Sequence, residues 1–377
     1  MYIRDSRKRK QQKRRNRLLF LIFLLIVIVA VVARQPGLIP NPFEPTPTPT
    51  PAPATFLRDA ELAYQEGRLV DAVAAYQSYL ALQPEEGMAW AQLARLQIWT
   101  DQPQAALESA QKAMAIDPQD AYFNAILAWA LDWIGDYNQA VSVGIHAVDL
   151  NPQLADARAY LSEVYADLGN WRRAEEEARE GVRLNPQNVD AHRALAYAFN
   201  VQGNYRESIA AYTEAIAVHP RLARLYYELG LNYSALGDHK QAIEQYRQAI
   251  AIHPTYALAY DALGWAYYYQ DDPERAIIEL ERAVEMDPEN LEAGAHLGMA
   301  LYRRQRYEDA VIPLERAVTA LIAQERKVNE AYLYTLGLAY IYGEPRNCDA
   351  AVPWLQEALA VNPFSQPALV GLQTCGQ

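Results

Sequence analysis

The chain has 377 residues and a formal net charge of −12 at pH 7, and 51% of its residues are hydrophobic. This charge is unevenly distributed. Residues 1–17 hold nine Lys and Arg against Asp5, a net of +8, so residues 18–377 hold 25 basic and 45 acidic residues, a net of −20. A body this acidic repels nucleic-acid phosphates, which argues against nucleic acid as a partner.

A run of sixteen apolar residues, Leu18–Ala33, follows the basic segment. As a helix it is about 24 Å long, short of the ~30 Å hydrocarbon core of a bilayer, and Arg17 and Arg34 can reach the two interfaces. The run predicts a transmembrane helix over residues 18–34. By the positive-inside rule, the basic residues 1–17 are expected in the cytoplasm and the rest of this single-pass membrane protein in an extracytoplasmic compartment. A cleaved signal peptide is the alternative.

Eight prolines lie between Pro36 and Pro53, and they include an alternating Thr-Pro run at residues 46–51. Such a sequence cannot form helix or sheet ladders and adopts extended polyproline II structure. We therefore expect a Pro/Thr-rich linker over residues 35–54. It is a semi-rigid spacer that reaches roughly 50 Å.

Seven prolines in the rest of the chain are each 34 residues after the one before: Pro84, Pro118, Pro152, Pro186, Pro220, Pro254 and Pro288. A domain with one irregular core has no reason to keep a fixed interval. A stack of identical two-helix units produces a fixed interval, because each unit buries its apolar face against a neighbour of equal length.

Small and large residues also recur in fixed columns. Within each unit the apolar spacing of three and four residues is helical. Small residues permit two helices to cross closely, and they recur at Gly230, Gly264 and Gly298 in one helix and at Ala242, Ala276 and Ala310 in the other. Large residues fill the surrounding space, for example Tyr233, Tyr246, Tyr267 and Leu280.

This pattern resembles the tetratricopeptide repeat, a helix-turn-helix unit of 34 residues. The resemblance implies an all-α fold, a right-handed α-solenoid of about nine repeats over residues 55–363. It weakens at the eighth unit, where Ile322 stands at the proline position, so the second helix is expected to continue toward Val328. A capping helix is expected within residues 364–377, over Gln366–Thr374.

No catalytic constellation stands out. The six histidines include no closely spaced pair, two cysteines alone cannot form a structural zinc site, and no glycine-rich phosphate loop is present. His219 and His253 precede a closing proline, where they are expected to cap a helix end. The sequence therefore predicts a protein that is not an enzyme and that holds neither a cofactor nor a metal.

The two cysteines are Cys348, at the turn before the last long helix, and Cys375, at the end of the capping helix. In a stack of antiparallel helices these two positions return to the same side. If the solenoid is exported, a disulfide between them can persist and would stabilise the C-terminus by roughly 3 kcal/mol. Two unpaired thiols are the alternative.

The resemblance also implies a binding groove, because the first helices of such repeats line a concave surface that holds an extended peptide. The residues at these positions are expected to be Trp99, Trp129, Trp133, Tyr160, Tyr197, Tyr227, Asp261, Trp265, Tyr268 and Tyr302. Aromatic side chains often dominate binding energy, and the carboxylates among them favour a basic or neutral segment. Packing between helices is the competing role for these residues.

We therefore predict a membrane-anchored scaffold whose exported solenoid binds protein or peptide segments in the cell envelope. A module that stacks its aromatic residues on envelope glycans is one alternative. A structural spacer that self-associates is another. The sequence leaves the partner and the oligomeric state open.

Overall fold

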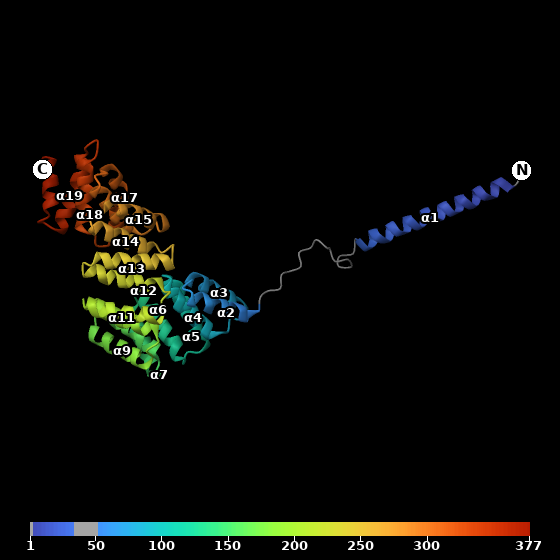
Figure 1. The fold of residues 1–377 in the computed structure, drawn as a ribbon, viewed down its shortest axis with the longest axis horizontal. Helices are drawn as coiled ribbons and strands as arrows, with labels where there is room; N and C mark the ends of the chain where they lie inside the picture. The colour runs from blue at the N-terminus through green and yellow to red at the C-terminus, as the bar shows by residue number, and fades with distance from the viewer. Residues whose placement is uncertain (1–2, 34–51) are drawn as a thin grey trace. The chain divides into compact units, whose positions relative to one another are not determined.

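In the computed structural model, residues 3–33 and 52–377 are described, and they contain twenty helices and no strand (Figure 1). The chain divides into two units, Met1–Ala52 and Pro53–Gln377. The second unit is an all-α helical repeat solenoid, as the 34-residue spacing predicts. The linker expected over residues 35–54 lies outside the described residues as far as residue 51, and a helix already begins at Pro53.

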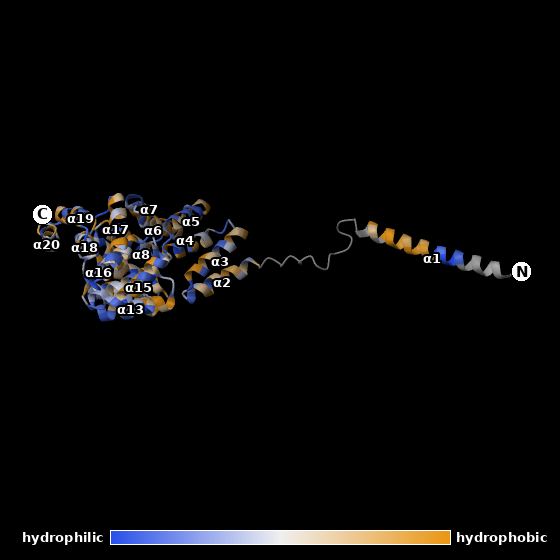
Figure 2. Cartoon of the chain, turned by 90° about the horizontal axis from the view of Figure 1, so that it is seen from above, coloured by the Kyte–Doolittle hydropathy of each residue, from blue (hydrophilic) through white to orange (hydrophobic). Residues whose placement is uncertain are grey.

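The described part of the first unit is one helix, α1 (Ile3–Ala33). Figure 2 shows its apolar C-terminal portion, and the preceding portion is hydrophilic. Among the described residues, no helix combines the length and apolar character needed to cross a membrane. The transmembrane helix expected over residues 18–34 therefore finds no support in the structure.

The second unit consists of nine helix hairpins and a final cap. The first helices of the hairpins are α2 (Pro53–Gln65), α4 (Gly87–Trp99), α6 (Ala121–Trp133), α8 (Ala155–Asp167), α10 (Val189–Val201), α12 (Ala223–Ala235), α14 (Ala257–Tyr269), α16 (Leu291–Arg303) and α18 (Glu330–Tyr342). The second helices are α3 (Leu69–Leu82), α5 (Pro103–Ile116), α7 (Tyr137–Leu150), α9 (Trp171–Leu184), α11 (Tyr205–Val218), α13 (His239–Ile252), α15 (Pro273–Met286), α17 (Tyr307–Ala323) and α19 (Cys348–Val361). The cap is α20 (Gln366–Thr374).

Each hairpin of the later repeats is held together by a close helix crossing at the glycine column. A Cβ atom on Gly264 would lie 2.6 Å from Leu280 Cγ and 3.0 Å from the carbonyl oxygen of Ala276. Gly230 faces Tyr246 and Gly298 faces Leu314 in the same way. The columns of small and large residues thus reflect contact between the two helices of one unit.

A hydrogen bond also recurs at each closing proline. Its carbonyl oxygen accepts a bond from the side chain six residues later, and the donors differ in type: Trp90, Asn124, Arg158, His192, Tyr226 and Tyr260. Pro288 is the exception, because the residue six positions later is Gly294, which has no side chain to donate. The carbonyl oxygen of Pro288 instead accepts a hydrogen bond of 3.0 Å from Arg316 Nη2 on α17.

The eighth hairpin differs from the expectation that its second helix continues toward Val328. α17 ends at Ala323, although its 17 residues exceed the 14 of the other second helices. Glu325 has a positive φ of 55°, and the amide of Arg326 donates to the carbonyl of Leu321, so the backbone turns away from the helix axis. Val328 is buried in the adjoining core.

The first five hairpins curve tightly, because α4, α6, α8 and α10 pack directly against one another. The curvature brings the α2–α3 turn back to the segment before α12, where a Cβ atom on Gly67 would overlap the carbonyl oxygen of Arg221. The rings of Tyr64 and His219 lie 4.7 Å apart at the same junction. Residues 53–224 therefore form a closed turn of the solenoid (Figure 1).

The later hairpins are arranged more openly. α12, α14, α16 and α18 make far fewer contacts with one another than the first helices of the closed turn do. We call this part, residues 225–377, the open half. At its end, Cys348 and Cys375 form a disulfide with Cα atoms 5.6 Å apart, which is the pairing expected from the topology. The bond holds the cap against α19.

The two glycines of α16 provide a test of the helix crossing. Gly298→Ala should lower the free energy of unfolding by about 1–3 kcal/mol, because the added methyl group overpacks the contact with Leu314. Gly294→Ala is the matched control. Its Cβ atom would lie 3.7 Å from the nearest atom, so the gain in helix propensity should raise stability by roughly 0.5–1 kcal/mol. Urea unfolding followed by circular dichroism measures both, and equal effects would contradict this explanation.

Candidate functional site

The ten residues predicted to line a groove fall into two groups. Trp99, Trp129 and Tyr160 belong to the closed turn and have exposed fractions of 4%, 1% and 0%. The expectation that these three present a binding surface is therefore wrong, because the closed turn brings opposite walls together over them. Trp133 and Tyr197, in the same turn, are half-buried.

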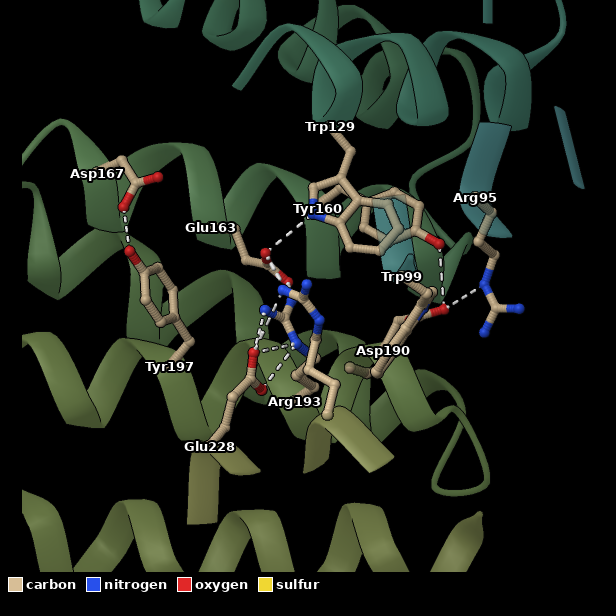
Figure 3. Close-up of polar contacts among 12 residues, drawn as sticks. Arg95, Trp99, Trp129, Tyr160, Glu163, Asp167, Asp190, Arg193, Tyr197 and Glu228 are labelled. Carbon is tan, nitrogen blue, oxygen red and sulfur yellow. Dashed lines mark hydrogen bonds and ion pairs between the residues drawn. The ribbon is translucent and has the colours of Figure 1, made fainter. Parts of the chain in front are cut away.

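The interior of the closed turn holds a network of buried charges. Asp190, on α10, accepts hydrogen bonds from Arg95 Nε at 2.7 Å, from Trp99 Nε1 at 3.0 Å and from the Tyr160 hydroxyl at 3.1 Å (Figure 3). Arg95 also donates to the hydroxyl of Tyr64 on α2. Each oxygen of this carboxylate thus has a partner, which offsets the cost of burying it.

A second group of charges is centred on Arg193. Its Nη1 atom donates to the two carboxylate oxygens of Glu163 at 2.8 and 2.9 Å, and its Nη2 atom donates to Glu228 at 2.8 Å. Trp129 Nε1 also donates to Glu163, at 2.9 Å. These contacts connect α6, α8, α10 and α12 (Figure 3). Because every charge here has a partner within the chain, the interior of the closed turn is suited to holding the repeats together.

Arg224 completes the closure. Its guanidinium pairs with Asp101, in the turn after α4, and lies 4.8 Å from the centre of the Trp133 ring. The sequence offers a signal for part of this network, since Glu163, Arg193 and Glu228 are 30 and 35 residues apart and so occupy neighbouring repeats. It offers none for the contact between Arg95 and Asp190, which spans 95 residues.

A cavity of about 310 Å³ beside this network contains a pair of carboxyl groups, Asp132 and Asp167. Burial, together with the neighbouring Asp167 carboxyl, raises the pKa of Asp132 to about 9. Burial also raises the pKa of Asp167, although the hydrogen bond that Tyr197 donates to this carboxyl partly opposes the shift. The pair of carboxyl groups therefore keeps a proton to a higher pH than a free carboxyl group does.

The open half has a larger cavity, of about 700 Å³, between α12, α14 and α16. We call it the aromatic groove and define it by the residues Tyr227, His239, Asp261, Trp265, Tyr269, Glu292 and His296. Three of the predicted residues, Tyr227, Asp261 and Trp265, line it. Tyr268 stacks on Trp265 outside the cavity lining, Tyr302 packs near Tyr307 on α17, and both are half-buried.

Trp265 is at the centre of the aromatic groove. Its ring stacks on those of His296, at 4.0 Å, and Tyr268, at 4.6 Å, and it meets Tyr269 edge-on at 5.1 Å. Tyr269 in turn stacks on His239, whose Nδ1 atom is buried without a hydrogen-bond partner. The groove thus has a wall of rings in contact with one another, and His239 Nδ1 is available there for a hydrogen bond.

Two carboxylates accompany the rings. Asp261 contacts His296 Nδ1 at 2.7 Å, and Glu292 accepts a hydrogen bond from the Tyr332 hydroxyl at 3.0 Å. Arg326, which does not line the cavity, pairs with Glu292 at 3.2 Å. None of the residues lining this cavity is Lys or Arg. The arrangement can surround an apolar or cationic side chain, since rings and carboxylates both attract cations.

Among residues 3–33 and 52–377, no group of three or more His, Cys, Asp or Glu side chains could hold a metal ion.

Comparison with known proteins gives a family but no annotated relative. Three family models, each described as tetratricopeptide repeat, match residues 63–130 and 134–198, residues 187–254 and residues 262–325. A search of curated proteins gives no match.

The fold is shared with many solved structures, including the two that follow. A chain of the APC/C hetero-tetramer Cut9–Hcn1 is 20% identical with a TM-score of 0.66, over 80% of this chain and 58% of its own length. A structure from the functional characterization of Pseudomonas aeruginosa pilF is 21% identical with a TM-score of 0.51, over 58% of this chain and 96% of its own.

The raised pKa of Asp132 predicts an unusual pH dependence. Its pKa is about 9 in the folded chain against 3.8 for the free side chain, so between these values the folded state binds more protons than the unfolded state. The contribution of Asp132 to stability therefore falls as pH rises from about 4 to about 9. Asp132→Asn should remove this contribution. The melting temperature of the variant minus that of the wild type should therefore increase from pH 5 to pH 8.5. The exposed Asp149→Asn is the control, and a constant difference for Asp132→Asn would contradict the assignment.

Proposed function

The chain belongs to the tetratricopeptide repeat family, whose repeats indicate a protein–protein interaction scaffold, and we propose that it holds a segment of a protein partner in the aromatic groove. The observation that carries this proposal is the contrast between the two parts of the solenoid. In the closed turn, the chain's own charged and aromatic side chains pair with one another, and the remaining cavity of about 310 Å³ is lined by Arg193 and Arg224 as well as by carboxyl groups. In the open half, side chains of the same kinds line a cavity of about 700 Å³.

The chemistry of the groove favours a basic segment over an acidic one. Asp261 and Glu292 lie among the rings, and no Lys or Arg lines the cavity. A lysine or arginine side chain placed against Tyr269, a ring of the groove that is 56% exposed, gains a cation–π contact of ~0.5–2 kcal/mol in addition to its attraction to the carboxylates. A neutral glycan can also stack on such rings, but it makes no use of the two charges.

We also propose that α1 attaches the solenoid to a membrane. The large apolar side chains from Leu18 to Ile28 are exposed in the described helix, and the basic residues before them suit an anionic membrane surface. The side of the membrane on which the solenoid lies remains a prediction of the positive-inside rule.

Truncating the central ring should separate binding from folding. In the full-length protein, Trp265→Ala should weaken the binding of a basic peptide by roughly 30-fold, as expected for a hot spot worth about 2 kcal/mol. Trp171→Ala is the matched control, because this tryptophan lies on α9, outside the groove, and is 50% exposed. Fluorescence anisotropy with peptides selected from an array of defined charge measures both effects.

Three results would count against the proposed segment. They are selection of acidic peptides, equal losses for the two tryptophan variants, and binding of a polysaccharide in place of peptides. Light scattering at several concentrations tests self-association separately.

Membrane attachment has its own test. Full-length protein in isolated membranes should stay in the pellet after extraction with alkaline carbonate, whereas a variant without residues 18–33 should be released. Recovery of the full-length protein in the supernatant would rule out an anchoring role for α1.

A further inference from the structure

A separate pocket of about 360 Å³ lies between α15, α16 and α17, next to Gly294. We call it the Gly294 slot. Its floor includes the buried side chains of Leu297 and Leu301, and Ile312, at its rim, is 73% exposed. A Cβ atom on Gly294 would have its nearest neighbour 3.7 Å away. The slot exists because position 294 has no side chain, whereas the same position in the six preceding units is occupied by a hydrogen-bond donor.

The preceding repeat shows what such a slot holds when it is filled. There, the Tyr260 hydroxyl donates to the carbonyl oxygen of Pro254 at 3.1 Å. The guanidinium of Arg282 lies 6.0 Å from the centre of the ring, and the ring packs in one cluster with Ala283 and the nearby Ile250. Tyr226 makes the same bond to Pro220, also at 3.1 Å.

The residues 34 positions later line the Gly294 slot: Pro288, Arg316, Ala317 and Val284 correspond in turn to Pro254, Arg282, Ala283 and Ile250. The pocket therefore keeps the acceptor, the cation and the apolar walls of a tyrosine site and lacks only the ring. Its arginine has solvent-filled space around it. The Arg316 side chain is 56% exposed, and its present bond to Pro288 is the one that a tyrosine hydroxyl makes in the repeat before.

We propose that the Gly294 slot binds a tyrosine side chain of a protein partner. The ring takes the place that Tyr260 occupies in its own repeat, the hydroxyl donates to the Pro288 carbonyl, and the Arg316 cation lies over the electron-rich face of the ring. A phenylalanine fits the walls but leaves the acceptor unused.

The slot also adjoins the candidate interface. Asn290, in the turn before α16, lines both the Gly294 slot and the aromatic groove. A partner that lies in the groove can thus reach the slot over this turn, although the slot does not depend on the groove being occupied. Since the slot faces α15 and α17, it adds a contact outside the first-helix surface.

The test uses N-acetyl-L-tyrosinamide as the probe and N-acetyl-L-phenylalaninamide as its counterpart without the hydroxyl. Binding to the full-length protein is measured by saturation-transfer NMR titration. The wild type should bind the tyrosine amide saturably and at least fivefold more tightly than the phenylalanine amide. Gly294→Tyr fills the slot with the chain's own ring and should lower the affinity at least tenfold. Gly294→Ala leaves most of the space and should retain affinity within about threefold.

Thermal melts test whether the variants are folded. Gly294→Tyr is expected to melt at a higher temperature than the wild type, because it places a ring at the position that Tyr226 and Tyr260 occupy in the two preceding repeats. Trp265→Ala should bind the tyrosine amide normally, which separates this site from the aromatic groove. The proposal is overturned if the wild type shows no saturable binding, if the two amides bind equally well, or if the folded Gly294→Tyr and Gly294→Ala variants bind alike.

Discussion

Close contact between the two helices of each hairpin is the constraint on which the rest of the structure depends. Where Gly264 meets Leu280, even one methyl group is too large, so the hairpin has a single geometry of crossing. Nine such hairpins of nearly equal length can stack only through equivalent surfaces. What can still vary is the rotation of each hairpin relative to the next one. That rotation decides whether the concave surface is open or closed.

The buried charges account for where the solenoid is closed. Asp190 and Arg193 lie on one helix, α10, and they connect it to α8, to α12 and, across the closed turn, to α4. Buried ion pairs contribute little net stability, but breaking one leaves an uncompensated charge, so they select one arrangement strongly against its alternatives. The closed turn therefore gives the solenoid a rigid base, from which the open half extends with its aromatic groove exposed to partners.

The aromatic groove and the Gly294 slot use the same chemistry in different ways. In the groove, the rings belong to the chain, and the partner is expected to supply a cation. In the slot, the chain supplies the cation and the carbonyl acceptor, and the partner is expected to supply the ring. Both sites arise where a repeat departs from its neighbours, by wider spacing of the first helices in one case and by loss of a side chain in the other. Departures from the repeat are therefore the places to look for function in this chain.

The repeat and its length can be read from the sequence alone, because they follow from local spacing and from contacts within one hairpin, whereas the end of α17 could not be predicted in this way. The sequence also indicated three members of the aromatic groove, Tyr227, Asp261 and Trp265, since they occupy the inner face of their helices. The folded chain was needed to show that Trp99, Trp129 and Tyr160 are buried. Small rotations between successive hairpins add up over five repeats. The closure that results from this sum has no signal in the periodic pattern of the sequence. For the same reason, the contact between Arg95 and Asp190 became visible only once the turn was seen to close.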